Sequence, residues 1–167
     1  MNDDLRIKVR TLMACIREKR IDDAVDFLSE NSDLVSLQTP LGSFLHIASD
    51  EGSLELCKAL VKMGADINSK DGISGASPLH RAAANGNEKL LSYFIGLGAK
   101  LDTSEPDRNP LFTAIHYGHL NIVKLLIAAG IDTTVRYTGQ TMKNMGAIEF
   151  AHEWGREEIA AYIQSIA

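Results

Sequence analysis

Apolar residues recur every three or four positions in short stretches along most of the chain. In one such stretch the apolar residues are Leu54, Leu56, Cys57, Leu60 and Val61. This spacing places them on one face of a helix and leaves polar residues on the other face. Glycine follows this stretch and two similar ones, at Gly64, Gly98 and Gly130. Because glycine tolerates the left-handed conformation in which helices commonly end, the pattern predicts amphipathic helices that stop beside these three glycines.

The same pattern returns with a nearly fixed period. Three segments superimpose when they are aligned from Ser43, Ser77 and Asn109. Their closing glycines are 34 and 32 residues apart. A period of this length is typical of stacked supersecondary units, none of which can bury its own apolar face alone. The sequence therefore predicts a helical repeat protein.

The motifs within these segments resemble the ankyrin repeat. That repeat has T-P-L-H before its first helix, a glycine before its second helix, and G-A-D-V-N after it. The best matches here are Ser77-Pro78-Leu79-His80 and Gly64-Ala65-Asp66-Ile67-Asn68. The resemblance implies an all-α, ankyrin-repeat solenoid of stacked helix-turn-helix units with hairpin-like loops.

The two ends of the chain are divergent copies of the same unit. Residues 14–28 resemble a first repeat in which Lys19 stands where glycine is usual, and residues 147–163 resemble a last repeat. Terminal repeats diverge because one of their faces lacks a neighbour. We expect a single ankyrin-repeat domain over residues 1–167, with caps at both ends. The approximate repeats are 12–38, 39–72, 73–105, 106–138 and 139–167.

Composition and charge narrow the range of partners. The chain has 17 Lys and Arg against 22 Asp and Glu, a formal net charge of -5, whereas binding to a phosphate backbone needs clustered cations. No apolar run approaches the roughly 20 residues of a membrane span. The first residues also lack the basic and apolar regions of a secretory signal. We expect a cytoplasmic protein, monomeric when free, that binds another protein and neither nucleic acid nor membrane.

No motif in the sequence indicates a catalytic, cofactor or metal site. Nucleophile elbows, glycine-rich phosphate loops and H-E-x-x-H helices are missing from it. Cys15 and Cys57 lie in helical apolar patterns that are typical of buried thiols. His46 and His80 could be drawn as metal ligands, but no Cys/His pair has the spacing of a zinc site. The resemblance implies instead that such histidines link the loop backbones of adjacent repeats by hydrogen bonds.

The resemblance also implies where a partner binds, because ankyrin proteins use their loop tips and the concave face formed by the first helices. The two residues before each mid-repeat glycine point into that groove. Two loops that are longer than the repeat requires, 71–76 and 135–146, add further candidates. The candidate partner-binding residues are Asp50, Glu51, Ile73, Ala84, Asn85, His116, Tyr117, Arg136, Tyr137, Glu153 and Trp154.

Trp154 is the only tryptophan of the chain. Interfaces are enriched in Trp and Tyr, because a rigid ring buries a large area at little entropic cost. Trp154 and Tyr117 are therefore candidate anchors, with packing of Trp154 against the final helix as the alternative. Asp50 and Glu51 either attract a basic partner surface or are simply solvated.

The loop over residues 135–146 carries further binding candidates. Arg136 and Tyr137 supply hydrogen-bond donors and an aromatic ring, and the loop also holds Gln140 and soft methionine side chains. Such residues suit a binding surface if the loop exposes them.

These features favour a non-catalytic protein-protein interaction module that acts as an inhibitor or an immunity-type protein. One alternative is a structural adaptor or scaffold subunit of a larger complex. The other is an enzyme or a small-molecule sensor. Function on a repeat scaffold depends on a few surface positions, so the partner is defined by those positions and not by the fold.

Overall fold

The structure is a computed structural model that describes residues 3–139 and 142–166. Within these ranges ten α-helices form five helix-turn-helix pairs, and no strand is present. The helices are α1 (Asp3–Arg17), α2 (Ile21–Glu30), α3 (Phe44–Asp50), α4 (Leu54–Lys62), α5 (Pro78–Ala84), α6 (Glu88–Gly96), α7 (Pro110–Tyr117), α8 (Leu120–Ala128), α9 (Ala147–Glu153) and α10 (Glu157–Ser165). The predicted all-α fold class is confirmed.

Short irregular elements complete the loops between the helix pairs. The 3-10 helix η1 (Ser32–Leu34) follows α2, and η2 (Pro106–Arg108) precedes α7. Isolated β-bridges join Thr39 to Gly42 and Tyr137 to Met145. These bridges give two of the loops the hairpin-like form that the resemblance implied.

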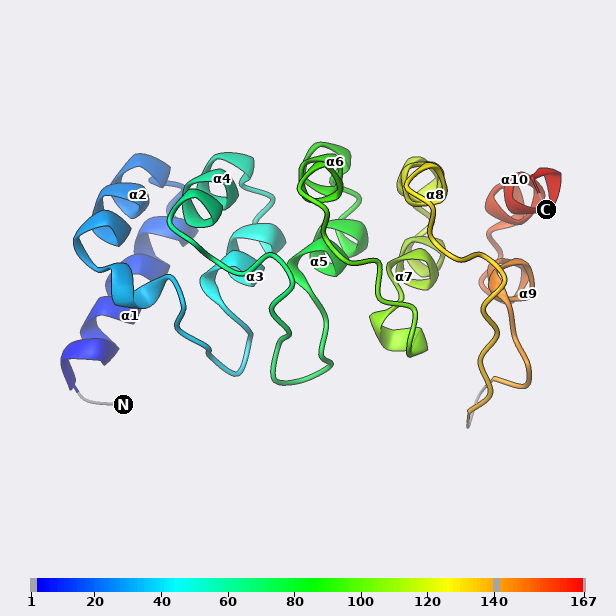
Figure 1. Ribbon diagram of the computed structural model, residues 1–167, viewed down its shortest axis with the longest axis horizontal. Coiled ribbons are helices and arrows are strands. Elements are labelled where there is room, and N and C mark those ends of the chain that lie inside the picture. The colour runs from blue at the N-terminus through cyan, green and yellow to red at the C-terminus, as the bar shows by residue number, and fades with distance from the viewer. Residues whose placement is uncertain (1–2, 140–141, 167) are drawn as a thin grey trace. The chain divides into compact units, whose positions relative to one another are not determined.

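Backbone contacts divide the chain into two compact units, one up to Pro78 and one from Leu79 onward. In the first unit α2 packs against α4. In the second unit α6 packs against α8, α7 against α9, and α8 against α10 (Figure 1). Each unit therefore buries its apolar faces by stacking neighbouring helix pairs, as expected for a repeat protein. The first helix begins at Asp3, well ahead of residue 12, where the sequence placed the start of the first repeat.

The ends of the second helices lie where the glycines predicted them. Helices α4, α6 and α8 each stop two residues before Gly64, Gly98 or Gly130. All three glycines have positive φ, as the left-handed helix terminus requires. The prediction of these helix ends is confirmed.

The turn inside each pair also contains a residue with positive φ. In four of the pairs this residue is glycine, and in the first pair it is Lys19, with φ of 57°. A side chain with a Cβ in this conformation costs about 1–2 kcal/mol relative to an ordinary helical conformation. Lys19 thus takes the backbone conformation of the glycine that it replaces in the repeat.

Side chains and prolines start several of the helices. Ser53 and Asn87 accept hydrogen bonds from the backbone N–H groups of Leu56 and Leu90 at the starts of α4 and α6. Helices α5 and α7 each begin with a proline. Proline suits this position because its missing N–H would have no partner in the first turn.

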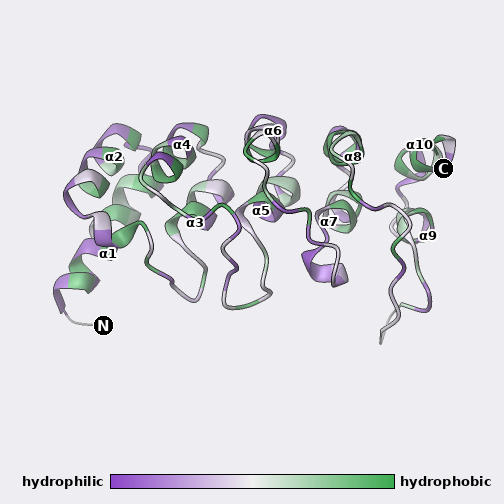
Figure 2. Ribbon diagram, viewed as in Figure 1, coloured by the Kyte–Doolittle hydropathy of each residue, from purple (hydrophilic) through white to green (hydrophobic). Residues whose placement is uncertain are grey.

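The core consists of the facing sides of the paired helices. Fully buried side chains include Phe44 and Leu60 in the first unit, and Leu79 and Phe94 in the second. In Figure 2 the helices of the second unit carry both hydrophobic and hydrophilic residues, whereas η2 is hydrophilic.

His46 links two loops of the first unit, as the resemblance implied. Its Nδ1 accepts a hydrogen bond from the Ser43 backbone N–H at 3.1 Å, so Nε2 carries the proton. The Nε2–H donates to the carbonyl oxygen of Ala76 at 3.0 Å. His80 Nε2 lies 2.6 Å from the hydroxyl oxygen of Thr113 on α7, so this contact is with a side chain. Both histidines therefore serve the packing of repeats.

Candidate functional site

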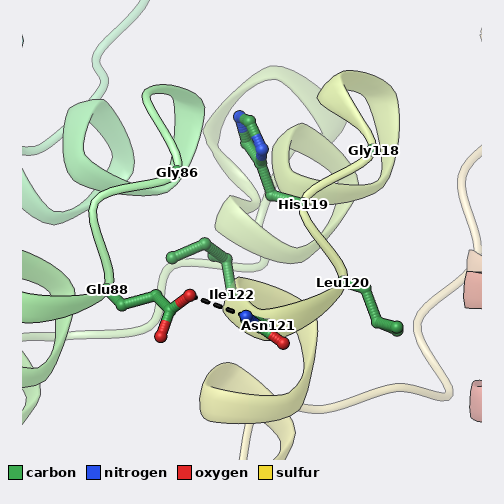
Figure 3. Close-up of a pocket in the computed structure, with 7 residues that line it drawn as sticks. All are labelled: Gly86, Glu88, Gly118, His119, Leu120, Asn121 and Ile122. Carbon is green, nitrogen blue, oxygen red and sulfur yellow. Dashed lines mark hydrogen bonds between the residues drawn. The ribbon is translucent and has the colours of Figure 1, made fainter.

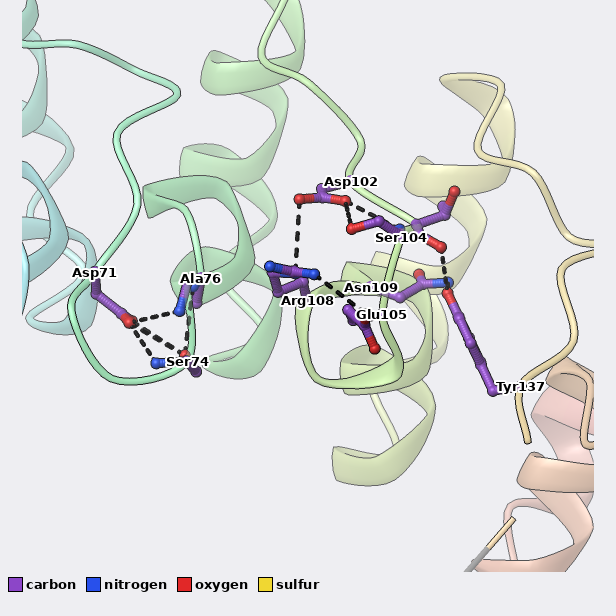
Figure 4. Close-up of polar contacts among 11 residues, drawn as sticks. Asp71, Ser74, Ala76, Asp102, Ser104, Glu105, Arg108, Asn109 and Tyr137 are labelled. Atoms are coloured by element: carbon purple, nitrogen blue, oxygen red, sulfur yellow. Dashed lines mark hydrogen bonds and ion pairs between the residues drawn. The ribbon is translucent and has the colours of Figure 1, made fainter. Parts of the chain in front are cut away.

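The candidate residues of the first unit lie on its surface. Asp50 and Glu51 are exposed at the end of α3, and Ile73 exposes 72% of its surface at the tip of the loop after α4. A buried carboxylate fixes this loop, because Asp71 Oδ1 accepts hydrogen bonds from the backbone N–H groups of Ile73, Ser74 and Gly75 at 2.7–3.0 Å (Figure 4). Ile73 is therefore an exposed apolar side chain on an ordered turn.

In the second unit the residues before the mid-repeat glycines lie at equivalent helix ends. Ala84 and Asn85 end α5, His116 and Tyr117 end α7, and Glu153 and Trp154 end α9. The side chains become more aromatic from α5 to α9. Tyr117 exposes 55% of its surface and Trp154 exposes 46%. These two rings are the large exposed aromatic side chains of this unit.

Trp154 belongs to a row of six aromatic rings that runs from the core to the surface. Consecutive ring centroids lie 4.0–6.0 Å apart. The aromatic row consists, in order, of Tyr137, Phe112, Phe150, Trp154, His116 and Tyr117. The indole of Trp154 meets the His116 ring edge-to-face at 4.0 Å and 74°, an arrangement that aromatic rings favour. Trp154 is therefore held in one orientation while almost half of its surface faces solvent.

Tyr137 is not a surface residue, and the prediction that its loop exposes this ring is wrong. Its exposed fraction is 9%, and its ring packs edge-to-face on Phe112. The hydroxyl donates a hydrogen bond to the Thr103 carbonyl oxygen at 2.7 Å and accepts one from Asn109 Nδ2 at 2.9 Å (Figure 4). Burial raises the pKa of this phenol. Tyr137 anchors the loop to the core, because its ring and its hydroxyl both find partners there.

Arg136 is exposed, but its guanidinium is engaged within the chain. Nε donates to the Asn144 carbonyl oxygen at 2.8 Å, and Nη2 pairs with Glu149 Oε1 at 2.6 Å. The guanidinium lowers the pKa of the Glu149 carboxyl. Tyr137 and Met145 exchange two backbone hydrogen bonds of 2.9 Å, so the flanks of the loop form a hairpin. Gln140, another candidate in this loop, lies outside the described residues.

A pocket of about 270 Å³ opens beside Trp154. We call it the α9 pocket, and its lining residues are Met142, Met145, Phe150, Glu153 and Trp154. Positions i, i+3 and i+4 share one face of a helix, so α9 contributes Phe150, Glu153 and Trp154 together. The loop contributes the two methionines, whose flexible side chains adapt to different ligands. Sequence reasoning missed Phe150, although its position four residues before Trp154 could have indicated it.

A second pocket, of about 260 Å³, surrounds His119 (Figure 3). His119 Nε2 lies 3.0 Å from the Ala84 carbonyl oxygen, and Asn121 Nδ2 donates to Glu88 Oε1 at 2.7 Å. A Cβ on Gly86 would lie 2.9 Å from the His119 ring. The polar groups of this pocket are thus hydrogen-bonded across it, which suits a role in stacking α6 against α8.

Within residues 3–139 and 142–166, no group of three or more His, Cys, Asp or Glu side chains is arranged to hold a metal ion. None of the helices described above has the length and apolar character needed to cross a membrane.

Comparison with known proteins identifies the family. The family described as ankyrin repeats, in three copies, matches residues 45–137 and 79–164. The chain belongs to the ankyrin-repeat family. Ankyrin repeats are protein-protein interaction modules, and the chain is one of them.

Similar proteins carry this ankyrin region in different settings. Palmitoyltransferase ZDHHC13 of Mus musculus is 40% identical over 90 residues, which is 53% of this chain and 14% of that protein. Palmitoyltransferase Hip14 of Drosophila melanogaster is 36% identical over 91 residues, 53% of this chain and 14% of that protein. Protein phosphatase 1 regulatory subunit 27 of Mus musculus is 38% identical over 101 residues, 59% of this chain and 65% of that protein. The match thus spans about one seventh of the palmitoyltransferases and just under two thirds of the regulatory subunit.

Proposed function

We propose that this ankyrin-repeat protein binds one protein partner through the aromatic end of its second unit and inhibits that partner by covering part of its surface. The observation that carries the proposal is Trp154, a large ring that is nearly half exposed and yet fixed by His116 and Phe150. Such a ring loses little conformational entropy when a partner covers it, which is why Trp and Tyr dominate interface hot spots.

The neighbouring residues extend this surface. Tyr117 packs edge-to-face on His116 and exposes more than half of its surface, and Glu153 adds a carboxylate next to Trp154. Asn85 provides a polar group at the corresponding end of α5. In the first unit, Asp50, Glu51 and Ile73 are candidates for additional contacts.

The regulatory class of function has support from one relative. Protein phosphatase 1 regulatory subunit 27 is by its name a regulator, and 65% of its length matches this chain. An inhibitor or immunity-type protein is a binding protein of the same general kind, because it changes the activity of its partner through contact.

The test begins with a partner that co-purifies stoichiometrically from source cells. Affinity is then measured by calorimetry for the wild type and for Trp154→Ala. Loss of a hot spot costs about 2 kcal/mol or more, which corresponds to roughly a 30-fold increase in Kd. The matched control is Leu97→Ala, which removes an apolar side chain of similar exposure outside this surface. The partner's activity should fall when the wild type is added.

Two outcomes contradict the proposal. Unchanged affinity for Trp154→Ala would remove this ring from the interface. A large fall in the melting temperature of the same variant, with affinity unchanged at low temperature, would assign the ring to the terminal cap.

A structural adaptor is the second candidate. The palmitoyltransferases favour it, since the matched region is a small part of each of those larger proteins. An adaptor should hold two partners at once, whereas an inhibitor should form a one-to-one complex. Mass measurement of the purified complexes by light scattering distinguishes these two candidates.

A further inference from the structure

We infer that the α9 pocket binds an apolar side chain of the partner and that Glu153, at its edge, pairs with a lysine or arginine beside that side chain. This inference rests on the proposed function and specifies the chemistry of the segment that is recognised. It combines the shape of one pocket with the charge distribution around it.

The pocket is suited to a large apolar side chain. Four of its five lining residues are Met, Phe or Trp, and all five belong to the second unit. Its volume of about 270 Å³ is many times the roughly 10–15 Å³ that a cavity needs to hold one water. Phe150 forms the fixed base, because it is buried and packs on Phe112 with a centroid distance of 4.8 Å. Met142 and Met145 can adjust to the shape of the incoming side chain.

The Glu153 carboxylate favours a basic residue next to that apolar side chain in the partner segment. The Glu153 carboxylate is exposed, and it makes no ion pair or hydrogen bond with another described residue. Two of the nearby cations are engaged elsewhere, Arg136 with Glu149 and Arg156 with the His116 carbonyl oxygen. The acidic carboxylate is therefore available to a partner at this edge of the pocket.

Three further titratable side chains lie near the pocket in the sequence, at His152, Glu157 and Lys143. His152 Nδ1 lies 2.9 Å from Glu157 Oε2, so the His152 ring is engaged with a carboxylate other than Glu153. Lys143 is exposed in the loop, and over the described part of the chain no ion pair joins it to Glu153. The chain as a whole carries a formal net charge of -5, which also favours a basic segment during encounter.

The exposed indole strengthens the preference for a cation. Trp154 follows Glu153 directly and is 46% exposed. A lysine or arginine that pairs with Glu153 can also lie over the face of this ring, where the ring quadrupole attracts it. The carboxylate and the aromatic face together discriminate against an acidic residue at the same position.

The test uses short synthetic peptides titrated into the full chain. They have glycine and serine flanks around Leu-Arg, Leu-Glu or Ala-Arg. Binding is measured by intrinsic fluorescence, since Trp154 is the only tryptophan and lines the pocket. We expect the Leu-Arg peptide to bind at least tenfold more tightly than the other two. Met142→Ser should remove the preference for leucine over alanine.

A charge reversal makes the test specific. Glu153→Lys should invert the order, so that the Leu-Glu peptide binds better than the Leu-Arg peptide. Glu158→Lys is the matched control, because it makes the same charge change at an exposed glutamate of α10 and should leave the order unchanged. Failure of every peptide to bind, or an order that Glu153→Lys does not invert, overturns the inference.

The same variants separate this inference from the proposed function. Suppose that Trp154→Ala weakens binding of the natural partner and Glu153→Lys does not. The aromatic surface is then part of the interface, but the inferred preference for a lysine or arginine is wrong. If neither variant weakens binding of the natural partner, the proposed function itself is wrong.

Discussion

The guanidinium of Arg156 donates two hydrogen bonds to the carbonyl oxygen of His116, at 3.2 Å from Nε and 2.8 Å from Nη2. An equivalent contact joins the preceding pair of turns, where His119 Nε2 lies 3.0 Å from the Ala84 carbonyl oxygen. In both cases the residue after a mid-repeat glycine contacts the turn of the repeat before it. The Arg156 contact fixes the backbone of the histidine whose ring supports Trp154, so it connects the stacking of repeats to the candidate binding surface.

Replacing Arg156 by alanine should therefore destabilise the second unit. A hydrogen bond that involves a charged group contributes about 1.5–3 kcal/mol, and partial exposure reduces this, so we expect a loss of about 1–2 kcal/mol. Chemical denaturation measures the loss. Arg6→Ala, which removes an exposed i,i+3 ion pair of α1, should change stability by less than about 0.5 kcal/mol. Equal losses for the two variants would show that the Arg156 contact contributes nothing of its own.

Lys19→Gly should stabilise the protein. Removing the Cβ from a residue in the left-handed conformation raises the free energy of unfolding by about 1–2 kcal/mol. The greater conformational freedom of glycine in the unfolded chain lowers it by about 0.4–1 kcal/mol. We expect a net gain of about 0–1.6 kcal/mol in the free energy of unfolding. The opposite sign is expected for Lys89→Gly, since this exposed residue lies in the first turn of α6, where glycine costs up to about 1 kcal/mol. A loss of stability in Lys19→Gly would mean that the lysine side chain makes a compensating contact.

The buried thiol of Cys57 predicts a stability change at alkaline pH. Burial raises its pKa to about 12, above the value of about 8.5 for an unfolded chain. Because the folded-state pKa is the higher one, this contribution is fully present below the unfolded pKa and is lost as pH rises toward the folded pKa. Between these values the wild type should lose about 1.4 kcal/mol per pH unit relative to Cys57→Ala. Urea unfolding at several alkaline pH values measures this difference, and a difference that is constant with pH would contradict it.

The features that sequence correctly predicted are those that one residue or one short motif determines locally. Gly64, Gly98 and Gly130 mark helix ends because each supplies a backbone conformation that other residues adopt at a cost. Pro110 marks a helix start for a similarly local reason. The role of His46 could be predicted because the resemblance to the ankyrin repeat assigns it to a histidine at this position of the motif, although the segment here reads Ser43-Phe44-Leu45-His46 and lacks the proline.

The features that sequence missed depend on residues far apart in the chain. Tyr137 lies in a loop without periodicity, and its burial depends on Thr103 and Asn109, which belong to the preceding loop and helix start. The α9 pocket exists because the loop methionines lie over the face of α9 that carries Phe150. Neither arrangement follows from a repeat pattern, since both involve the insertion that makes this loop longer than the others.

Tyr137→Phe tests the corrected role of that tyrosine. The substitution keeps the ring on Phe112 and removes the hydroxyl, which leaves the Asn109 amide and the Thr103 carbonyl without this partner. A buried polar group that loses its hydrogen bond costs about 1–3 kcal/mol, so we expect a destabilisation of that size in chemical denaturation.

Tyr117→Phe is the matched control, because it removes the same hydroxyl from a ring that is 55% exposed. Water replaces the lost hydrogen bonds there, so stability should change by less than about 0.5 kcal/mol. For partner binding we expect the opposite order of importance. Tyr117→Ala should weaken binding, whereas Tyr137→Phe should leave binding unchanged at temperatures where the fold is intact. If Tyr137→Phe is as stable as the wild type but binds the partner more weakly, the hydroxyl belongs to the interface and the loop must open to present it.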